Sequence, residues 1–241
     1  MRNFLAQSFV LILMMAISSI AIANNIQVSN VEVVDQIADQ ETYVVQFDLS
    51  WENSWRTSSA PNNHDAAWVF IKWRNLNGEW HHAELYRQSD DAAADGHVFA
   101  PGSTGDIPDD QVGMFVYRDS NGNGHNNFQQ MQLLWDYSAE VDLTDDFEIA
   151  VYAIEMVYVP EGSFYLGSED NYTFSEGTLP LAFFVDSEDE EITLGGGSNG
   201  SLWNGYYTGD DNNPDDFDDV ESRTLPAEWP IGYHAYYVMK Y

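Results

Sequence analysis

Alternation of apolar and polar residues between positions 43 and 74 predicts two strands. In the first, polar residues alternate with five large apolar ones, Tyr43, Val45, Phe47, Leu49 and Trp51. This period of two is typical of a strand with one buried face. Residues 68–73 are apolar on both faces except for Lys72, as in a central strand. The Ser-, Asn- and Pro-rich residues 53–65 predict an ordered loop, whose Trp55 and Arg56 fold back onto the sheet.

The rest of the first 160 residues continues this β pattern. We expect further strands over 26–35, with a bulge near Asn30, and over 79–85, 112–118, 129–137 and 147–159. A turn over 75–78, a long polar loop over 88–110 and a tight turn over 119–124 separate them. Helical periodicity is absent from the sequence. The pattern predicts an all-β protein whose residues 24–155 form an antiparallel β-sandwich of immunoglobulin or fibronectin III style; a jelly roll is the alternative.

The character of the sequence changes after Val159. Gly, Asn, Asp and Glu dominate residues 167–219, and short apolar islands interrupt them. We expect short strands in a loop-rich second part, residues 156–241, which ends on the apolar, strand-prone segment 233–241.

Residues 1–23 have the features of an export signal. Arg2 supplies a positive start, residues 9–17 are apolar, and Ala21-Ile22-Ala23 fits a small-x-small cleavage pattern. A membrane anchor is the alternative, but the apolar run is shorter than the roughly 18 residues that span a bilayer. We therefore expect cleavage near Ala23, a secreted or periplasmic mature protein, and no membrane contact after cleavage.

Composition narrows the classes of function. The chain has 40 acidic and 8 basic residues, a formal net charge of −32, and no Cys. This charge argues against nucleic acid and anionic lipid as partners, because both need a basic surface. It suits solubility in salty water, or cation binding. Without Cys, disulfides, thiol catalysis and thiolate metal sites are excluded, so stability must come from an aromatic-rich core.

Two segments carry a family resemblance: residues 156–167 (MVYVPEGSFYLG) and residues 230–241 (PIGYHAYYVMKY). Together they resemble the opening of the formylglycine-generating enzyme / sulfatase-modifying factor domain. Residues 53–73 also resemble a module found ahead of that domain in secreted bacterial proteins of the Bacteroidetes type. The positions that match the opening of the sulfatase-modifying factor domain are Met156, Val157, Val159, Pro160, Gly162, Phe164, Gly167, Lys240 and Tyr241.

The resemblance implies that residues 156–241 are the incomplete start of a C-type-lectin-like domain. Formylglycine-generating enzymes use a pair of late cysteines to hold copper and activate oxygen, and this chain has no Cys. No catalytic residue of the family has a counterpart here. We therefore expect a truncated, N-terminal portion of such a protein, with no enzyme activity of its own.

Calcium is the candidate cofactor. Ca²⁺ takes roughly six to eight oxygen ligands, and one acidic segment offers several carboxylates, although acidic loops are more often simply solvated. The Asp residues concerned are Asp210, Asp211, Asp215, Asp216, Asp218 and Asp219. Asp119 to Gly124 matches only the first half of a calcium loop, because Gln130 stands where Glu is needed, and a plain hairpin turn is the better interpretation.

Aromatic and His residues offer two further candidate sites. Of Trp51, Trp55, Trp68, Trp73 and Trp80, most are expected in the core, and Trp55 and Trp68 are the candidates for stacking on a sugar. His81 and His82 are adjacent on a strand, point to opposite faces and cannot share a metal. We expect His64 and His125 in loops.

Three hypotheses for function follow. The first is an exported, non-catalytic binding or structural module with a protein or glycan partner. The second is part of a formylglycine-generating-type or related metal-dependent oxidase whose catalytic residues lie beyond Tyr241. The third is a carbohydrate-binding module.

Overall fold

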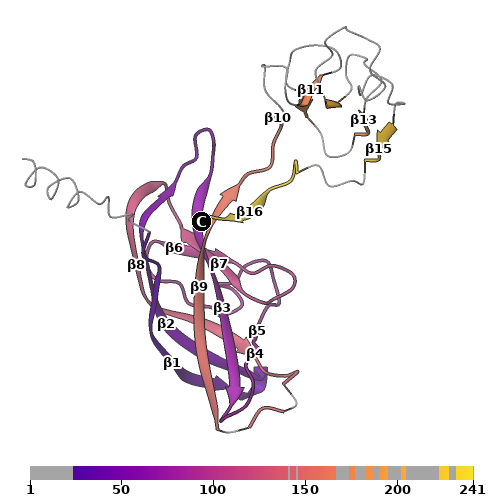
Figure 1. Ribbon diagram of the computed structural model, residues 1–241. Coiled ribbons are helices and arrows are strands. Elements are labelled where there is room, and N and C mark those ends of the chain that lie inside the picture. Colours follow the sequence, from indigo (N-terminus) through magenta and orange to yellow (C-terminus); the bar gives the residue numbers. More distant parts are fainter. Residues whose placement is uncertain are drawn as a thin grey trace, which may run out of the picture. The chain divides into compact units, whose positions relative to one another are not determined.

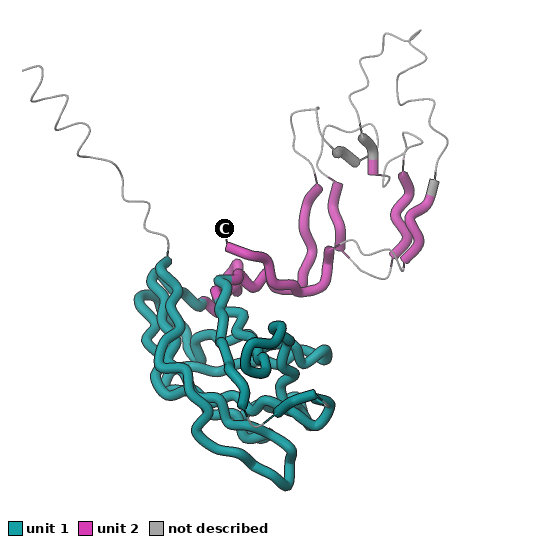
Figure 2. Tube along the Cα trace, turned by 60° about the horizontal axis from the view of Figure 1, so that its bottom comes forward, with its two compact units in different colours: residues 1–56, 66–155 teal, residues 57–65, 156–241 magenta. Residues whose placement is uncertain are grey.

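The structure is a computed structural model that describes residues 24–140, 142–144 and 146–166 and the short segments 174–176, 183–186, 190–194, 202–204, 223–227 and 232–240. The expected export signal, residues 1–23, lies outside these residues. The chain forms two compact units, residues 1–56 with 66–155 and residues 57–65 with 156–241 (Figure 2). Residues 57–65 group with the second unit, although they are distant from it in sequence.

The described residues are organised in strands, with one 3-10 turn and no α-helix (Figure 1). No described helix is long and apolar enough to cross a membrane. From the first unit into the start of the second, the elements are β1 (Gln27–Ile37), η1 (Ala38–Gln40), β2 (Thr42–Arg56), β3 (His64–Asn75), β4 (His81–His82), β5 (Glu84–Leu85), β6 (Ser103–Asp106), β7 (Met114–Arg118), β8 (Gly122–Asp136) and β9 (Phe147–Val159). Most of the predicted strands are therefore confirmed.

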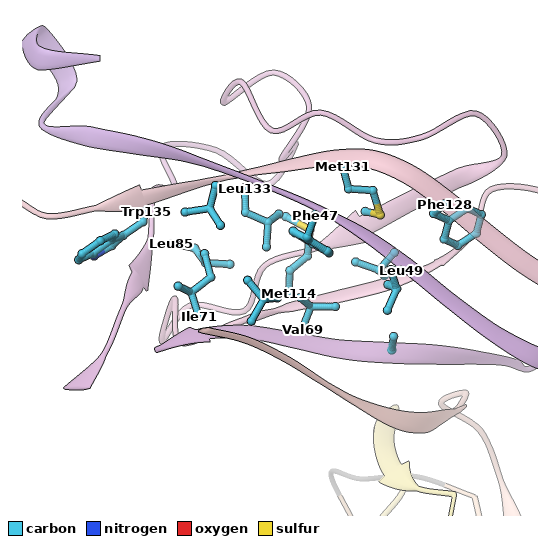
Figure 3. Close-up of a cluster of buried hydrophobic side chains, with 14 of the residues drawn as sticks. Phe47, Leu49, Val69, Ile71, Leu85, Met114, Phe128, Met131, Leu133 and Trp135 are labelled. Carbon is cyan, nitrogen blue, oxygen red and sulfur yellow. The ribbon is translucent and has the colours of Figure 1, made fainter. Parts of the chain in front are cut away.

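The strands of the first unit form one curled antiparallel sheet. Its main path runs β9-β3-β2-β8-β5. β1 pairs with β2, β4 and β7 pair with β3, and β6 pairs with β7. The curl brings β2 and β8 opposite β3 and β7 around one core, as the side chains in Figure 3 show.

The predicted inward face of β2 is confirmed. Val45, Phe47, Leu49 and Trp51 are fully buried, while Tyr43 packs at the edge of the same core. The facing residues come from β3, β7 and β8 at the same period of two: Val69, Ile71, Trp73, Met114, Met131, Leu133 and Trp135. Full burial of one such side chain stabilises the fold by about 1.5–3 kcal/mol.

Aromatic rings supply much of this core, as expected of a chain without disulfides. Trp73 stacks on Trp135 with ring centroids 5.7 Å apart, and Tyr43 lies 5.4 Å from Trp135. Phe147 of β9 meets the Trp135 ring edge-on at 5.5 Å. Rings from β2, β3, β8 and β9 therefore close one end of the core.

The loop expected over 53–65 is shorter than predicted. Trp55 and Arg56 are strand residues that pair with Asn123 and Gly122 of β8, so they do not fold back as a loop. The register of β2 against β8 shifts between Trp51 and Ser54, where Asn53 has φ 53°. The polar residues that indicate a loop in the sequence therefore form a bulge within a strand.

Three other predictions are corrected by the pairing. The polar stretch 88–110 contains β6, which pairs with β7. Of the turn predicted over 119–124, residues 122–124 belong to β8. The remaining turn joins β7 to β8 but is not a hairpin, because β7 pairs with β3 and β6 while β8 pairs with β2 and β5. His64 and His125 are not in loops, since they lie in β3 and β8.

In the second unit, the end of β9 pairs with β16 (Tyr236–Met239). The other strands are short: β10 (Phe164–Leu166), β11 (Phe174–Glu176), β12 (Phe183–Val185), β13 (Ile192–Leu194), β14 (Leu202–Asn204) and β15 (Arg223–Leu225). β10 and β12 form a two-stranded sheet. A separate four-stranded sheet has the order β11-β14-β13-β15, in which β13 and β14 are parallel. Phe183, Val185 and Ile192 form a small buried cluster with Phe164 and Leu194 against it.

Candidate functional site

A polar groove lies in the first unit over β1, β2 and β8. Its cavity has a volume of about 370 Å³ and is lined by Asn30, Val31, Glu32, Gln46, Asp48 and Gln130. Two β-bulges shape it. β1 shifts register between Ser29 and Glu32, and β8 places two residues opposite Asp48. The bulge predicted near Asn30 is therefore confirmed.

Asp48 is held at the centre of this groove by one bulge on each side. Asn30 Nδ2 donates to Asp48 Oδ2 at 2.6 Å, and the Gln130 backbone N–H donates to Oδ1 at 2.8 Å. Asn30 and Gln130 have φ of 53° and 55°, which only a small share of non-Gly residues adopt. Both carboxylate oxygens are thereby fixed in position.

A row of side-chain amides continues from the groove across the three strands. Gln132 Nε2 donates to Gln46 Oε1 at 3.0 Å, and Gln46 Nε2 donates to Glu32 Oε1 at 3.0 Å. Each amide uses only one of its N–H groups in these bonds. The groove therefore combines carboxylate acceptors with amide donors and one apolar residue, Val31.

Aromatic side chains occupy the face of β3 that does not point into the core. The Phe70 ring lies 5.5 Å from His82 of β4 and 5.4 Å from Tyr152 of β9, within 20° of parallel to each. Trp68 packs on Phe115 of β7 at 4.5 Å. This row across β4, β3 and β9 leaves Tyr152 48% exposed.

The Trp residues named as sugar-stacking candidates lie apart in the pairing. Trp55 pairs with Asn123 of β8, Trp68 pairs with Phe115 of β7, and both side chains are half-buried. Trp51 and Trp73 are core residues, as expected. Trp80 is 42% exposed, with the Arg74 guanidinium 4.6 Å from the centre of its ring.

The second unit holds a buried ion pair beside a His–Tyr contact. Lys240 Nζ lies 3.8 Å from the Asp65 carboxylate, which is 1% exposed. The His64 ring stacks on Tyr158 at 4.6 Å, and its Nε2 lies 3.2 Å from the Tyr237 hydroxyl. These contacts join β9, β16 and residues 64–65. Lys240, one of the positions that carry the family resemblance, therefore has a structural role here as the partner of a buried carboxylate.

The metal-site expectations have mixed outcomes. The six Asp residues between 210 and 219 lie outside the described residues. Asn123 and Gly124 are residues of β8, so the segment from Asp119 does not form a calcium loop of the predicted type. His81 stacks on inward-facing Trp73 and His82 on outward-facing Phe70, which confirms their opposite faces. Among the described residues, no group of three or more His, Asp or Glu side chains is arranged to hold a metal ion.

Burial shifts the pKa of one His beside β8. His97 is 3% exposed; burial lowers its pKa, and a hydrogen bond to Tyr86 O and the charge of Asp95 oppose this in part. Nε2 donates to Tyr86 O at 2.7 Å, and Nδ1 accepts the Leu134 N–H at 3.2 Å. Only a neutral imidazole makes both bonds.

Sequence reasoning missed the groove as a site. Its residues are dispersed over positions 30–32, 46–48 and 130, and the only sequence signal was the phase shift near Asn30. The second bulge, at Gln130, has no signal of that kind because a run of Gln residues carries no hydrophobic phase. Comparison with known proteins adds no assignment, since no protein-family model, curated protein or solved structure matches this chain.

Proposed function

We propose that this chain is an exported binding or structural protein, the N-terminal portion of a sulfatase-modifying-factor-like protein, and that it does not itself catalyse a reaction. The first unit is the module, and residues 156–241 begin the second domain. The all-β fold with one core between curled strands supports a sandwich of immunoglobulin or fibronectin III style for the first unit.

One observation carries this proposal: the two segments that resemble the family opening pair with each other. Tyr236, Tyr237, Val238 and Met239 lie opposite Val159, Tyr158, Val157 and Met156 in an unbroken antiparallel register. Beyond the strands, the Gly162 N–H donates to Tyr233 O at 3.1 Å, and His234 lies 3.5 Å from Glu161. Two segments about 80 residues apart in sequence therefore form one paired structure, as expected if both belong to the start of one domain.

In the proposed exported protein, the mature chain starts at Asn24, the residue after the expected cleavage position. It is 3% exposed, its Nδ2 donates to Glu155 at 2.8 Å, and its carbonyl accepts the Glu52 N–H at 2.7 Å. Asn24, the first residue of the proposed mature chain, is therefore part of the folded module.

The lack of catalysis is tested with the chemistry of the resembled family. Purified mature protein, supplied with copper and oxygen, is incubated with a cysteine-containing sulfatase peptide, and peptide mass is followed. We expect no change, because the chain has no Cys to hold copper in the way that the family does. An authentic formylglycine-generating enzyme is the positive control. Conversion of the peptide thiol to an aldehyde by this chain would contradict the proposal.

A further inference from the structure

The groove over β1, β2 and β8 has the dimensions of a small-ligand site. Its volume of about 370 Å³ lies near the lower end of the range of such sites, roughly 300–1,000 Å³. Its central carboxylate is fixed before any ligand arrives, because Asn30 and the Gln130 N–H hold one oxygen each. Preorganisation of this kind reduces the entropy lost on binding.

The hydrogen-bonding capacity that remains in the groove is mixed. A carboxylate has about four acceptor positions, of which Asp48 uses two in these bonds. Glu32 supplies further acceptors, and the Asn30, Gln46 and Gln130 amides supply donors. A matching ligand must therefore donate and accept hydrogen bonds at neighbouring positions, which is what adjacent hydroxyl groups do.

Charge and local geometry disfavour anions and metal ions as ligands. The carboxylates of the groove and the net charge of −32 repel anions. A metal cation would have to approach Asp48 oxygens to which two N–H groups already point, and N–H dipoles repel cations. Val31 offers an apolar surface against which the C–H groups of a sugar ring can pack.

We propose that this groove binds a neutral carbohydrate through its hydroxyl groups, with Asp48 and Glu32 accepting hydrogen bonds and the Asn30 and Gln46 amides donating them. The proposal rests on the binding role proposed above and names its ligand class. The two can fail separately, because the peptide assay tests catalysis and the experiment below tests binding. It also places the sugar site away from Trp55 and Trp68.

The test uses the complete mature protein on a printed array of neutral oligosaccharides, followed by titration of the strongest binder. We expect Asp48→Asn and Glu32→Gln each to weaken binding by about tenfold or more, because each removes a charged acceptor. Glu32→Gln keeps an oxygen for the bond from Gln46, so a loss of fold does not explain its effect. Glu79→Gln, an exposed change outside the groove, is the matched control and leaves binding unchanged.

Salt and calcium distinguish the rival ligands. A neutral sugar keeps its affinity between about 50 and 500 mM NaCl, whereas a cationic ligand loses affinity as salt screens the carboxylates. The proposal is overturned if no array member binds, or if binding is lost in Trp55→Ala or Trp68→Ala but kept in both groove variants. Calcium binding that depends on Asp48 in place of sugar binding would also overturn it.

Discussion

His97 illustrates how one buried polar side chain ties a loop to the sheet. Its imidazole ring joins the carbonyl of Tyr86 to the backbone N–H of Leu134 in β8. The backbone N–H of His97 donates to Ala92 O at 3.1 Å. The preceding residue, Gly96, has φ 103° and lies close to Leu134, so that a Cβ at this position would be 3.2 Å from the Leu134 side chain. The sequence shows none of this, because the partners are 11 and 37 residues away from His97.

Acidification should weaken this tie. Burial lowers the pKa of His97 below the ordinary value of 6.5, so the unfolded chain takes up the proton first. The contribution of His97 to the free energy of unfolding is therefore largest above pH 6.5 and declines as the pH falls below it. We expect the melting temperature to drop between pH 7.5 and 5.5, and the drop to be smaller in His97→Gln.

His125→Gln is the control for this prediction. His125 is an exposed residue of β8, and its replacement removes a His while leaving His97 and its partners in place. An equal pH dependence in the wild type and in His97→Gln would mean that His97 does not couple protons to folding.

At the scale of elements, β2 was the most predictable strand, because its inward residues are large and regularly spaced. Its inward residue Phe47 is fully buried between β8 and β3 (Figure 3). We expect Phe47→Ala to lower the free energy of unfolding by about 3–5 kcal/mol, since it leaves a cavity that neighbouring side chains do not fill. Denaturant unfolding followed by Trp fluorescence measures this change.

Ser50→Ala on the outer face of the same strand is the matched control. A surface change of this kind is expected to alter the free energy of unfolding by less than about 0.5 kcal/mol. Similar losses for both variants would mean that the inward and outward faces of β2 are wrongly assigned.

The elements that escaped prediction are those that lack an apolar face of their own. Alternation identifies β2, β3, β8 and β9 because each has an apolar face of its own. β6 (STGD) has no such face and is a strand only because β7 lies beside it. The end of β2 is likewise predicted to be a loop, because it contains Asn and Ser residues. In the structure these residues form a bulge, and the strand continues by pairing with β8.

At the scale of the whole molecule, the candidate site was less predictable than the fold. The groove depends on two bulges about 100 residues apart in sequence that meet at Asp48, and no spacing rule connects Asn30 with Gln130. The pair of segments at 156–159 and 236–239 was more accessible, because the family resemblance marks both. The side chains of the groove can be recognised as one site only when the register of the paired strands is known.

The central claim is that residues 156–159 and 236–239 form one strand pair, because the proposed relation to the sulfatase-modifying-factor domain depends on it. The most direct measurement introduces cysteines at opposed positions, Val157→Cys with Val238→Cys, into a chain that has none of its own. Directly opposed residues have Cβ atoms about 4.5–5.5 Å apart, within a small adjustment of disulfide geometry.

Mild oxidation followed by non-reducing peptide mass mapping reads out the bond. The control is Val157→Cys with Met239→Cys, which places the two thiols on opposite faces of the pair. We predict an intramolecular disulfide in the opposed pair and little or none in the control. Equal cross-linking of both, or of neither, would contradict the pairing and the domain assignment built on it.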